Sequence, residues 1–276
     1  MRFTAQEVQK MIPNSEVMQV FREGYGVIDG LVIREENPVP NKPYYTVYPQ
    51  YIEADSLPQL VERIYDMIER APGCSMNIKE LYDWKNVKND VVGILLSGDN
   101  KTACDEAGFA NIEWLDMILC VGVKKGDNMM RITNDHIRDW GVEKKEVFDS
   151  ALTNMQQKVR VMDLAEYMSH KLGVELTEDD LTMMRMFPMT MITNQEFNHG
   201  AAYIVPIVSM LAKSDCDRIL IPSSIHEWLV VDDDGRPMND WNDMIGGVNG
   251  EHVRPEERLS DHAYKLMSNG IVAFNW

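Results

Sequence analysis

One short segment, residues 218–235 with the sequence RILIPSSIHEWLVVDDDG, combines residue types that could perform catalysis. Ser224 could supply a nucleophile, and His226 could act as the base that activates it. A serine and a histidine perform acyl transfer when they lie within hydrogen-bonding distance and an acid orients the histidine. Glu227 and the more distant Asp261 are acids available for this role. Ser224, His226 and Asp261 are therefore candidate catalytic residues of a hydrolase-like enzyme.

The local pattern of the same segment favours a structural role over a catalytic one. If residues 226–231 form a strand, Ser224 and His226 share a face about 7 Å apart at the backbone, and Glu227 lies on the other face. The segment contains neither a Gly-x-Ser-x-Gly elbow nor an obvious oxyanion loop. Proline and serine are turn residues, and a serine hydroxyl can bond the backbone two residues on. We therefore interpret residues 222–225 as a turn between two strands, fixed by polar side chains.

The polar residues considered for this cluster come from three parts of the chain. They are Asn194, His199, Ser223, Ser224, His226, Glu227, Asp261 and His262. In the structural interpretation, His226 and Glu227 bond to a neighbouring segment, for which Asp261 and His262 are the candidates. Asn194 is expected to be a cap or turn residue.

The same histidines and acids are possible metal ligands, but they lack the spacing of a known metal motif. They could converge only through the tertiary fold, which leaves a metal-dependent enzyme open as an alternative. His-Glu-x-x-His is absent because residue 230 is valine, and residues 232–235 lack calcium-loop spacing. No glycine-rich phosphate loop occurs.

The four cysteines form no Cys-x-x-Cys pair and are expected to be buried reduced thiols. They are Cys74, Cys104, Cys120 and Cys216. We predict no metal and no cofactor.

The elements that must position these residues follow from hydrophobic periodicity and turn signals. Strands are predicted in residues 15–36, as a pair, and in residues 42–53, 91–98, 115–125 and 128–133. Helices are predicted at 56–71, capped by Ser56, at 134–141, capped by Asn134 and ended by Gly141, and at about 143–158 and 160–172. Residues 189–193 and 201–205 are predicted as a hairpin, because Pro206 would break a helix through this region. Residues 218–221 and 226–232 are two further strands, 238–249 a weak helix, and the tail carries one or two short strands.

This order of elements predicts the α+β class, with mostly antiparallel sheets and flanking helices. The helical stretch near residue 158 divides the chain into two similar-sized halves. These are residues 1–158 and 159–276, which either form two domains or pack as one.

The composition is strongly acidic, with 44 Asp and Glu against 27 Lys and Arg, a net charge of −17. Such a field repels phosphate backbones, so direct nucleic-acid binding is not expected. Three interpretations of the acidity are, in order of preference, solubility, a surface that binds a basic partner, and mimicry of nucleic acid.

No apolar run reaches the length of about 20 residues that spans a bilayer, and the N-terminus does not resemble a signal peptide. We expect a cytoplasmic protein without membrane contact.

Methionine is abundant, with 20 residues in the chain and five of them in MMRMFPMTM, residues 183–191. Methionine fills irregular cores and also lines adaptable binding surfaces. We expect a core role for this segment.

Several short motifs occur in an order and spacing that resemble a bacterial family of unknown function. They are ITNDHIRDWGV, MITN with HGAA, ILIPSSIHEW and RPEERLSDHAY. The family is the domain of unknown function numbered 5688, found mainly in anaerobic gut bacteria. The resemblance covers most of the chain, is firmest from about 128 to 265, and implies no established activity. Its most recognisable segments stand here as residues 221–227 and 259–261, and the chain departs from it at residues 231–235, which look like turn chemistry.

Three function hypotheses follow. The leading one is a non-enzymatic binding or regulatory protein with a protein partner, based on the acidity, the methionine-rich segment and the incomplete catalytic signature. The second is a hydrolase-like or metal-dependent enzyme centred on Ser224, His226 and Asp261. The third is an inhibitor that mimics nucleic acid.

Overall fold

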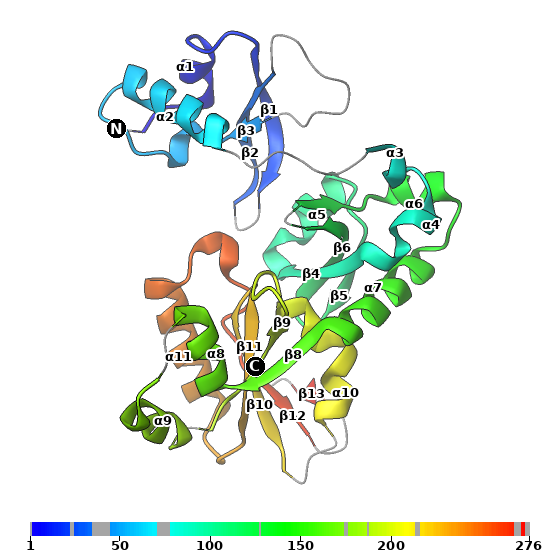
Figure 1. Cartoon of the computed structure of the whole chain (residues 1–276), viewed down its shortest axis with the longest axis vertical. Helices are drawn as coiled ribbons and strands as arrows, with labels where there is room; N and C mark the ends of the chain where they lie inside the picture. The colour runs from blue at the N-terminus through cyan, green and yellow to red at the C-terminus, as the bar shows by residue number, and fades with distance from the viewer. Residues whose placement is uncertain are drawn as a thin grey trace.

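The computed structural model describes residues 2–22, 25–34, 45–70, 78–126, 128–173, 176–186, 188–212, 216–267 and 272–273. Helices and three antiparallel sheets alternate along the chain, which confirms the predicted α+β class. Figure 1 shows the three sheets stacked along the long axis of the molecule, with the N-terminal one at the top. No helix within these ranges is both long and apolar enough to cross a bilayer.

The N-terminal unit, residues 2–70, packs a small sheet against two helices. Its elements are α1 (Ala5–Gln9), β1 (Ser15–Arg22), β2 (Gly26–Ile33), β3 (Tyr45–Val47), η1 (Pro49–Tyr51) and α2 (Leu57–Arg70). The predicted strand pair and the helix at 56–71 are confirmed, and Ser56 Oγ accepts a hydrogen bond from Gln59 N. Leu31, Leu60 and Ile64 are fully buried in a core formed within this unit.

The second sheet, in the middle of the molecule, has four strands. The elements are α3 (Ile78–Leu81), α4 (Trp84–Val87), η2 (Lys88–Asp90), β4 (Val91–Ser97), η3 (Gly98–Asn100), α5 (Lys101–Glu106), β5 (Asn111–Trp114), β6 (Met117–Lys125), β7 (Asn128–Arg131), α6 (Asn134–Trp140) and α7 (Lys144–Lys158). The strand order is β4-β6-β5, and β7 also pairs with the central strand β6. The predicted β6–β7 hairpin is confirmed. Gly141 ends α6 at φ 68°, as predicted, but the cap is Thr133 and not Asn134.

The third sheet carries six strands in the order β13-β12-β10-β11-β9-β8. The elements are β8 (Val159–Asp163), α8 (Leu164–Leu172), α9 (Glu178–Arg185), β9 (Thr190–Asn194), η4 (Ala201–Ile207), α10 (Val208–Leu211), β10 (Arg218–Ser224), β11 (Glu227–Asp232), α11 (Met238–His252), η5 (Pro255–Glu257), β12 (Tyr264–Leu266) and β13 (Val272–Ala273). Figure 1 shows α8 and α11 on one side of this sheet and α10 on the other. The helix that the sequence marked as weak, at 238–249, is the full helix α11.

Two predicted elements in this region were wrong. Residues 201–207 form the 3-10 helix η4 instead of a strand, and β9 pairs with β8 and β11. Ala201, Ala202 and Tyr203 are all buried, so this segment lacks the alternation of a half-exposed strand. Residues 159–163 form β8 instead of the start of a helix, because Val161 lies opposite Ile192 of β9 and Asp163 caps α8 through Glu166 N at 2.8 Å.

The largest core joins the second and third sheets. Trp228 of β11 is fully buried between Trp114 of β5 and Tyr264 of β12, with ring centroids 5.8 and 5.7 Å apart. The sequence boundary at residue 158 falls between α7 and β8, and this core includes residues from both sides of it.

Candidate functional site

The polar segment of the sequence forms a tight turn between β10 and β11. β10 continues through Ser224, so the connection is shorter than the predicted one: only Ile225 and His226 lie between the strands. Ser224 pairs with Glu227 across the turn, after a shift of register between Pro222 and Ser224. Because of this shift, Ser223 and Ser224 both lie near the Glu227 carboxylate. Strict alternation along the strand would have placed Glu227 on the face opposite Ser224.

Glu227, the first residue of β11, accepts the side-chain hydrogen bonds that hold the turn in place. It is only 5% exposed. Its Oε1 accepts hydrogen bonds from Ser223 Oγ at 3.1 Å and Ser224 Oγ at 3.0 Å, and its Oε2 accepts one from Tyr167 OH of α8 at 2.8 Å. Burial, and then the nearby carboxylate, raise the pKa of Tyr167, which therefore remains a hydrogen-bond donor. A buried carboxyl group with three hydroxyl donors fixes the turn against α8.

His226 makes its ring contacts away from Ser224. Its Nδ1 lies 3.1 Å from His199 N, which donates a hydrogen bond to it, so a neutral ring carries its proton on Nε2. Nε2 lies 3.6 Å from Glu257 Oε1. The His226 backbone N donates to Ser224 Oγ at 3.1 Å, and its carbonyl accepts from Thr193 Oγ1 at 2.8 Å.

The three candidate catalytic residues therefore do not form a hydrogen-bonded triad in the described contacts. Ser224 Oγ donates to Glu227, so the histidine ring is not its base in this arrangement. Asp261 is exposed and accepts from Asn249 Nδ2 of α11 at 2.7 Å. Glu257, from the short helix η5, faces His226, in place of the predicted Asp261 or His262.

His262 belongs to a second polar cluster, around Asp116. Asp116 Oδ2 accepts from Ser260 Oγ at 2.9 Å and lies 3.3 Å from His262 Nδ1, and its Oδ1 accepts from Tyr264 OH. Asp116 stands in the turn between β5 and β6, next to Leu115 with φ 59°. Through these contacts with Asp116, residues 260–264 are held against the β5–β6 turn of the second sheet. The sequence carries no signal for Asp116, because its partners lie more than a hundred residues away.

The loop of residues 195–200 closes over the turn and is shaped by Asn194. Asn194 Oδ1 accepts from the backbone N of Glu196 at 3.1 Å and of Asn198 at 3.2 Å, which confirms its predicted turn role. His199 has φ 51°. Burial is the main reason that its pKa falls from 6.5 to about 4, followed by the electrostatic influence of His226 and the positive charges of Lys124 and Arg131.

This depressed pKa predicts an acid-dependent loss of stability. Between about pH 6.5 and pH 4 the unfolded chain binds a proton at His199 that the folded protein does not, so stability falls as the pH is lowered through this window. Above it, neither state is protonated and the effect vanishes. The substitution His199→Asn removes the titration and tolerates the positive φ. Melting temperatures measured from pH 7 to pH 4 should therefore fall more steeply in the wild type than in His199→Asn; parallel curves would contradict the assignment.

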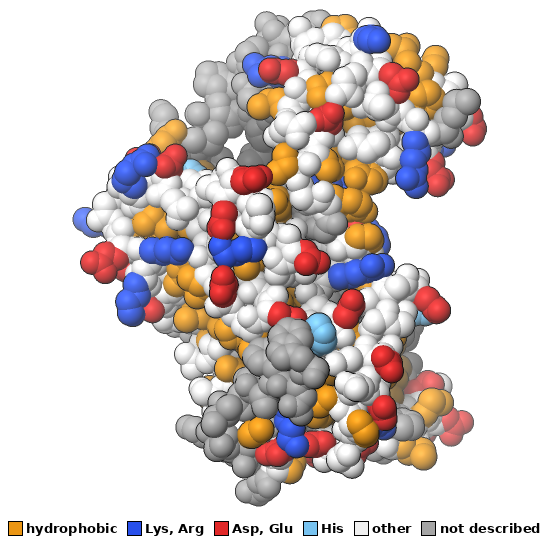
Figure 2. Space-filling view, turned by 180° about the vertical axis from the view of Figure 1, so that it is seen from behind, with side chains coloured by type: hydrophobic (Ala, Val, Ile, Leu, Met, Phe, Trp, Pro, Cys, Tyr) orange, Lys and Arg blue, Asp and Glu red, His pale blue; other side chains and the backbone are white. Residues whose placement is uncertain are grey.

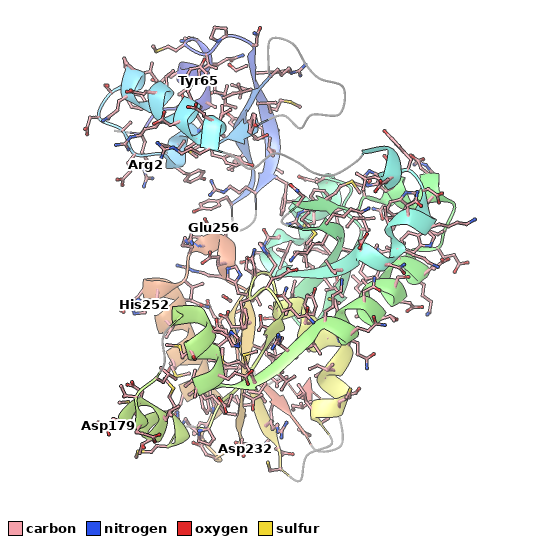
Figure 3. The ribbon with its side chains drawn as sticks, in the orientation of Figure 1. Arg2, Tyr65, Asp179, Asp232, His252 and Glu256 are labelled. Atoms are coloured by element: carbon pink, nitrogen blue, oxygen red, sulfur yellow. The ribbon has the colours of Figure 1, made fainter. Side chains whose placement is uncertain are left out.

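The N-terminal unit reaches the same region through the end of its β1–β2 hairpin. Arg22 lies 3.4 Å from Glu256 of η5, and Tyr25 OH donates to the same carboxylate at 3.1 Å. Figure 3 labels Glu256 directly below the N-terminal unit. The Arg22 guanidinium also lies 4.5–4.9 Å from the ring centroids of Tyr25, Tyr48 and Tyr51. Two adjacent residues of η5 therefore have different partners: Glu256 contacts the N-terminal unit, and Glu257 contacts His226.

A cavity of about 470 Å³ lies at the other end of β10 and β11, beside α8 and α9. Its apolar wall includes Leu164, Leu181, Met184, Met189 and Val230. Asp163, Asp232 and Arg218 provide its charges, and Arg218 Nε lies 3.7 Å from Asp232. We refer to this cavity as the α9 pocket. The core role expected for the methionine-rich segment holds for Met191, which is 2% exposed, but Met184 and Met189 line the pocket.

Within the described ranges, no group of three or more His, Cys, Asp and Glu is arranged to hold a metal ion. Cys104 and Cys120 are buried free thiols with their Sγ atoms 3.9 Å apart. Cys216 is exposed, contrary to the expectation of burial.

The comparisons with known proteins give a family but no activity. A family model described as a family of unknown function, DUF5688, matches residues 6–268. No curated protein and no solved structure matches the chain.

Proposed function

We propose that this chain, which belongs to the DUF5688 family of unknown function, is a non-enzymatic binding protein that receives a basic, amphipathic segment of a protein partner in the α9 pocket. The single observation that carries the proposal is the combination of an apolar, methionine-containing wall with carboxylates at its edge.

The wall of the α9 pocket suits an apolar anchor side chain. Its volume of about 470 Å³ lies within the range of about 300–1,000 Å³ that is usual for ligand sites. Met184 and Leu181 stand one turn apart on α9, and Met189 follows on the chain leading to β9. Methionine side chains adapt to partners of different shape, and they are frequent at surfaces that bind helices.

The edge of the pocket favours a cationic occupant. Asp163 and Asp232 line it, and α9, whose first turn carries Glu178, Asp179 and Asp180, contributes Leu181 and Met184 to the lining. Figure 3 labels Asp179 and Asp232 at the same lower end of the molecule. Arg218 is the basic residue of the lining, and it is close to Asp232. Lys and Arg on a partner would meet this acidic edge, and the net charge of −17 would speed their approach.

The two alternatives have less support from the geometry. A hydrolase centred on Ser224 and His226 would need the histidine ring at the serine hydroxyl, and the hydroxyl is bonded to Glu227. Mimicry of nucleic acid would need a face of carboxylates alone. On the face in Figure 2, Lys and Arg are interspersed with Asp and Glu.

A binding titration with designed peptides tests the proposal. An amphipathic peptide of leucine and lysine should bind, and its leucine and glutamate counterpart should not. We expect a dissociation constant of the order of 1–100 μM by calorimetry, weakening as salt is added. The double substitution Asp163→Asn with Asp232→Asn should weaken binding about tenfold, by loss of two charge contacts. Matched substitutions at the distant, exposed Glu69 and Asp66 of α2 serve as the control. Equal binding of both peptides, or no effect of the pocket substitutions, would exclude this site.

A further inference from the structure

The five methionines of residues 183–191 lie at graded depths, although they are close together in sequence. Met183 and Met186 are 61% and 71% exposed, Met191 is 2% exposed, and Met184 and Met189 are half-buried in the wall of the α9 pocket. One short segment thus contains thioethers that face solvent, the pocket and the core. A reagent that reacts with thioethers will meet these three positions at different rates.

We propose that Met184 and Met189 are a modification site for a peroxide, and that their oxidation switches the α9 pocket from apolar to polar. The inference rests on the proposed function for its biological meaning, since it regulates the same site. In the reaction, the sulfur attacks one peroxide oxygen and the O–O bond breaks. The sulfur loses two electrons and bonds to the transferred oxygen, whose proton passes to the departing hydroxide, so that the products are a sulfoxide and water.

The position of these two side chains explains why oxidation would matter here. A sulfoxide is a strongly polar acceptor, and both would belong to a wall in which Leu164, Leu181 and Val230 offer no hydrogen-bond donor from their side chains. An apolar anchor entering the pocket would then have to displace water from both sulfoxides without replacing its hydrogen bonds, which is unfavourable.

The exposed methionines Met183 and Met186 serve as an internal control for Met184 and Met189. Met183 and Met186 belong to or adjoin the same helix, and their greater exposure should make them react sooner, but they are not part of the pocket lining. Their oxidation should leave the pocket apolar. A bound partner should protect Met184 and Met189 while leaving Met183 and Met186 reactive.

The experiment combines peptide mapping with two binding probes on the full chain. Hydrogen peroxide is added, sulfoxides are located by mass spectrometry, and binding is measured for Nile red, a neutral apolar dye, and for the leucine and lysine peptide. We expect sulfoxide at Met183 and Met186 first, then at Met184 and Met189, with Met191 protected. Both probes should bind about tenfold more weakly once the pocket pair is oxidised. The variant with Met184→Leu and Met189→Leu should keep its affinity under peroxide, whereas Met183→Leu with Met186→Leu should lose it as the wild type does.

The outcomes separate this inference from the proposed function. If the dye responds as expected but the peptide never binds, the proposed function alone fails. If the peptide binds but oxidation of Met184 and Met189 changes neither probe, the modification site alone fails. The inference also fails if these two methionines resist peroxide after Met183 and Met186 have reacted, or if the variant lacking them is equally sensitive. A reduced protein that binds neither probe refutes both.

Discussion

Replacing Trp228 with alanine should lower the free energy of unfolding by about 3–5 kcal/mol, the cost typical of removing a fully buried tryptophan. The side chain has no exposed surface and touches Trp114 at an interplanar angle of 85° and Tyr264 at 51°. Alanine would leave a cavity where the four-stranded and six-stranded sheets meet. Trp114 and Tyr264, which flank this cavity, belong to different sheets. They cannot fill it unless one sheet moves toward the other.

The variant Trp228→Phe separates packing from hydrogen bonding. The Trp228 indole nitrogen is buried without a hydrogen-bond partner in the described part of the protein. Phenylalanine therefore loses volume but no hydrogen bond, and we expect a cost of about 1–2 kcal/mol. Urea unfolding followed by far-ultraviolet circular dichroism measures both variants without depending on tryptophan fluorescence. A cost for Trp228→Phe as large as that of Trp228→Ala would show that the indole nitrogen has a role that packing does not explain.

Replacing Gly200 with alanine should cost about 3 kcal/mol or more, because overpacking against backbone cannot be relieved by side-chain rotation. A Cβ at this position would lie 2.2 Å from Thr193 Oγ1, 2.6 Å from Asn194 N and 2.6 Å from the His226 carbonyl oxygen. Its φ of −86° is ordinary, so the need for glycine is steric and not conformational. The backbone must shift, and with it the contact of His199 N with His226 Nδ1.

Gly246→Ala is the matched control for this substitution. Gly246 lies within α11, and a Cβ there would meet nothing within 4 Å. We expect this variant to gain about 0.5–1 kcal/mol, because alanine favours the helix and restricts the unfolded chain. Thermal unfolding of the two variants should therefore move in opposite directions. A mild effect of Gly200→Ala would mean that the loop of residues 195–200 can separate from the turn at little cost.

Local patterns were enough to predict most elements of this chain. The apolar spacing of α2, the glycine that ends α6, and the β6–β7 hairpin all depend on residues close together in sequence, and each was confirmed. Those elements establish the α+β class. The family-marking segment around Ser224 and His226 was also recognisable as a turn between strands, although its length was not.

Tertiary structure decided the contacts that give the polar residues their roles. Residues 201–207 form a 3-10 helix in which Ala201, Ala202 and Tyr203 are all buried, and no local pattern records this packing. The turn is completed by Tyr167 and Glu257, and His262 contacts Asp116, through contacts between residues that are 31 to 146 positions apart in the chain. The α9 pocket likewise depends on α8, α9 and the end of the six-stranded sheet coming together. Periodicity and capping act within a few residues, whereas these partners are selected by packing between distant elements, and the sequence alone therefore determined the elements but not the sites between them.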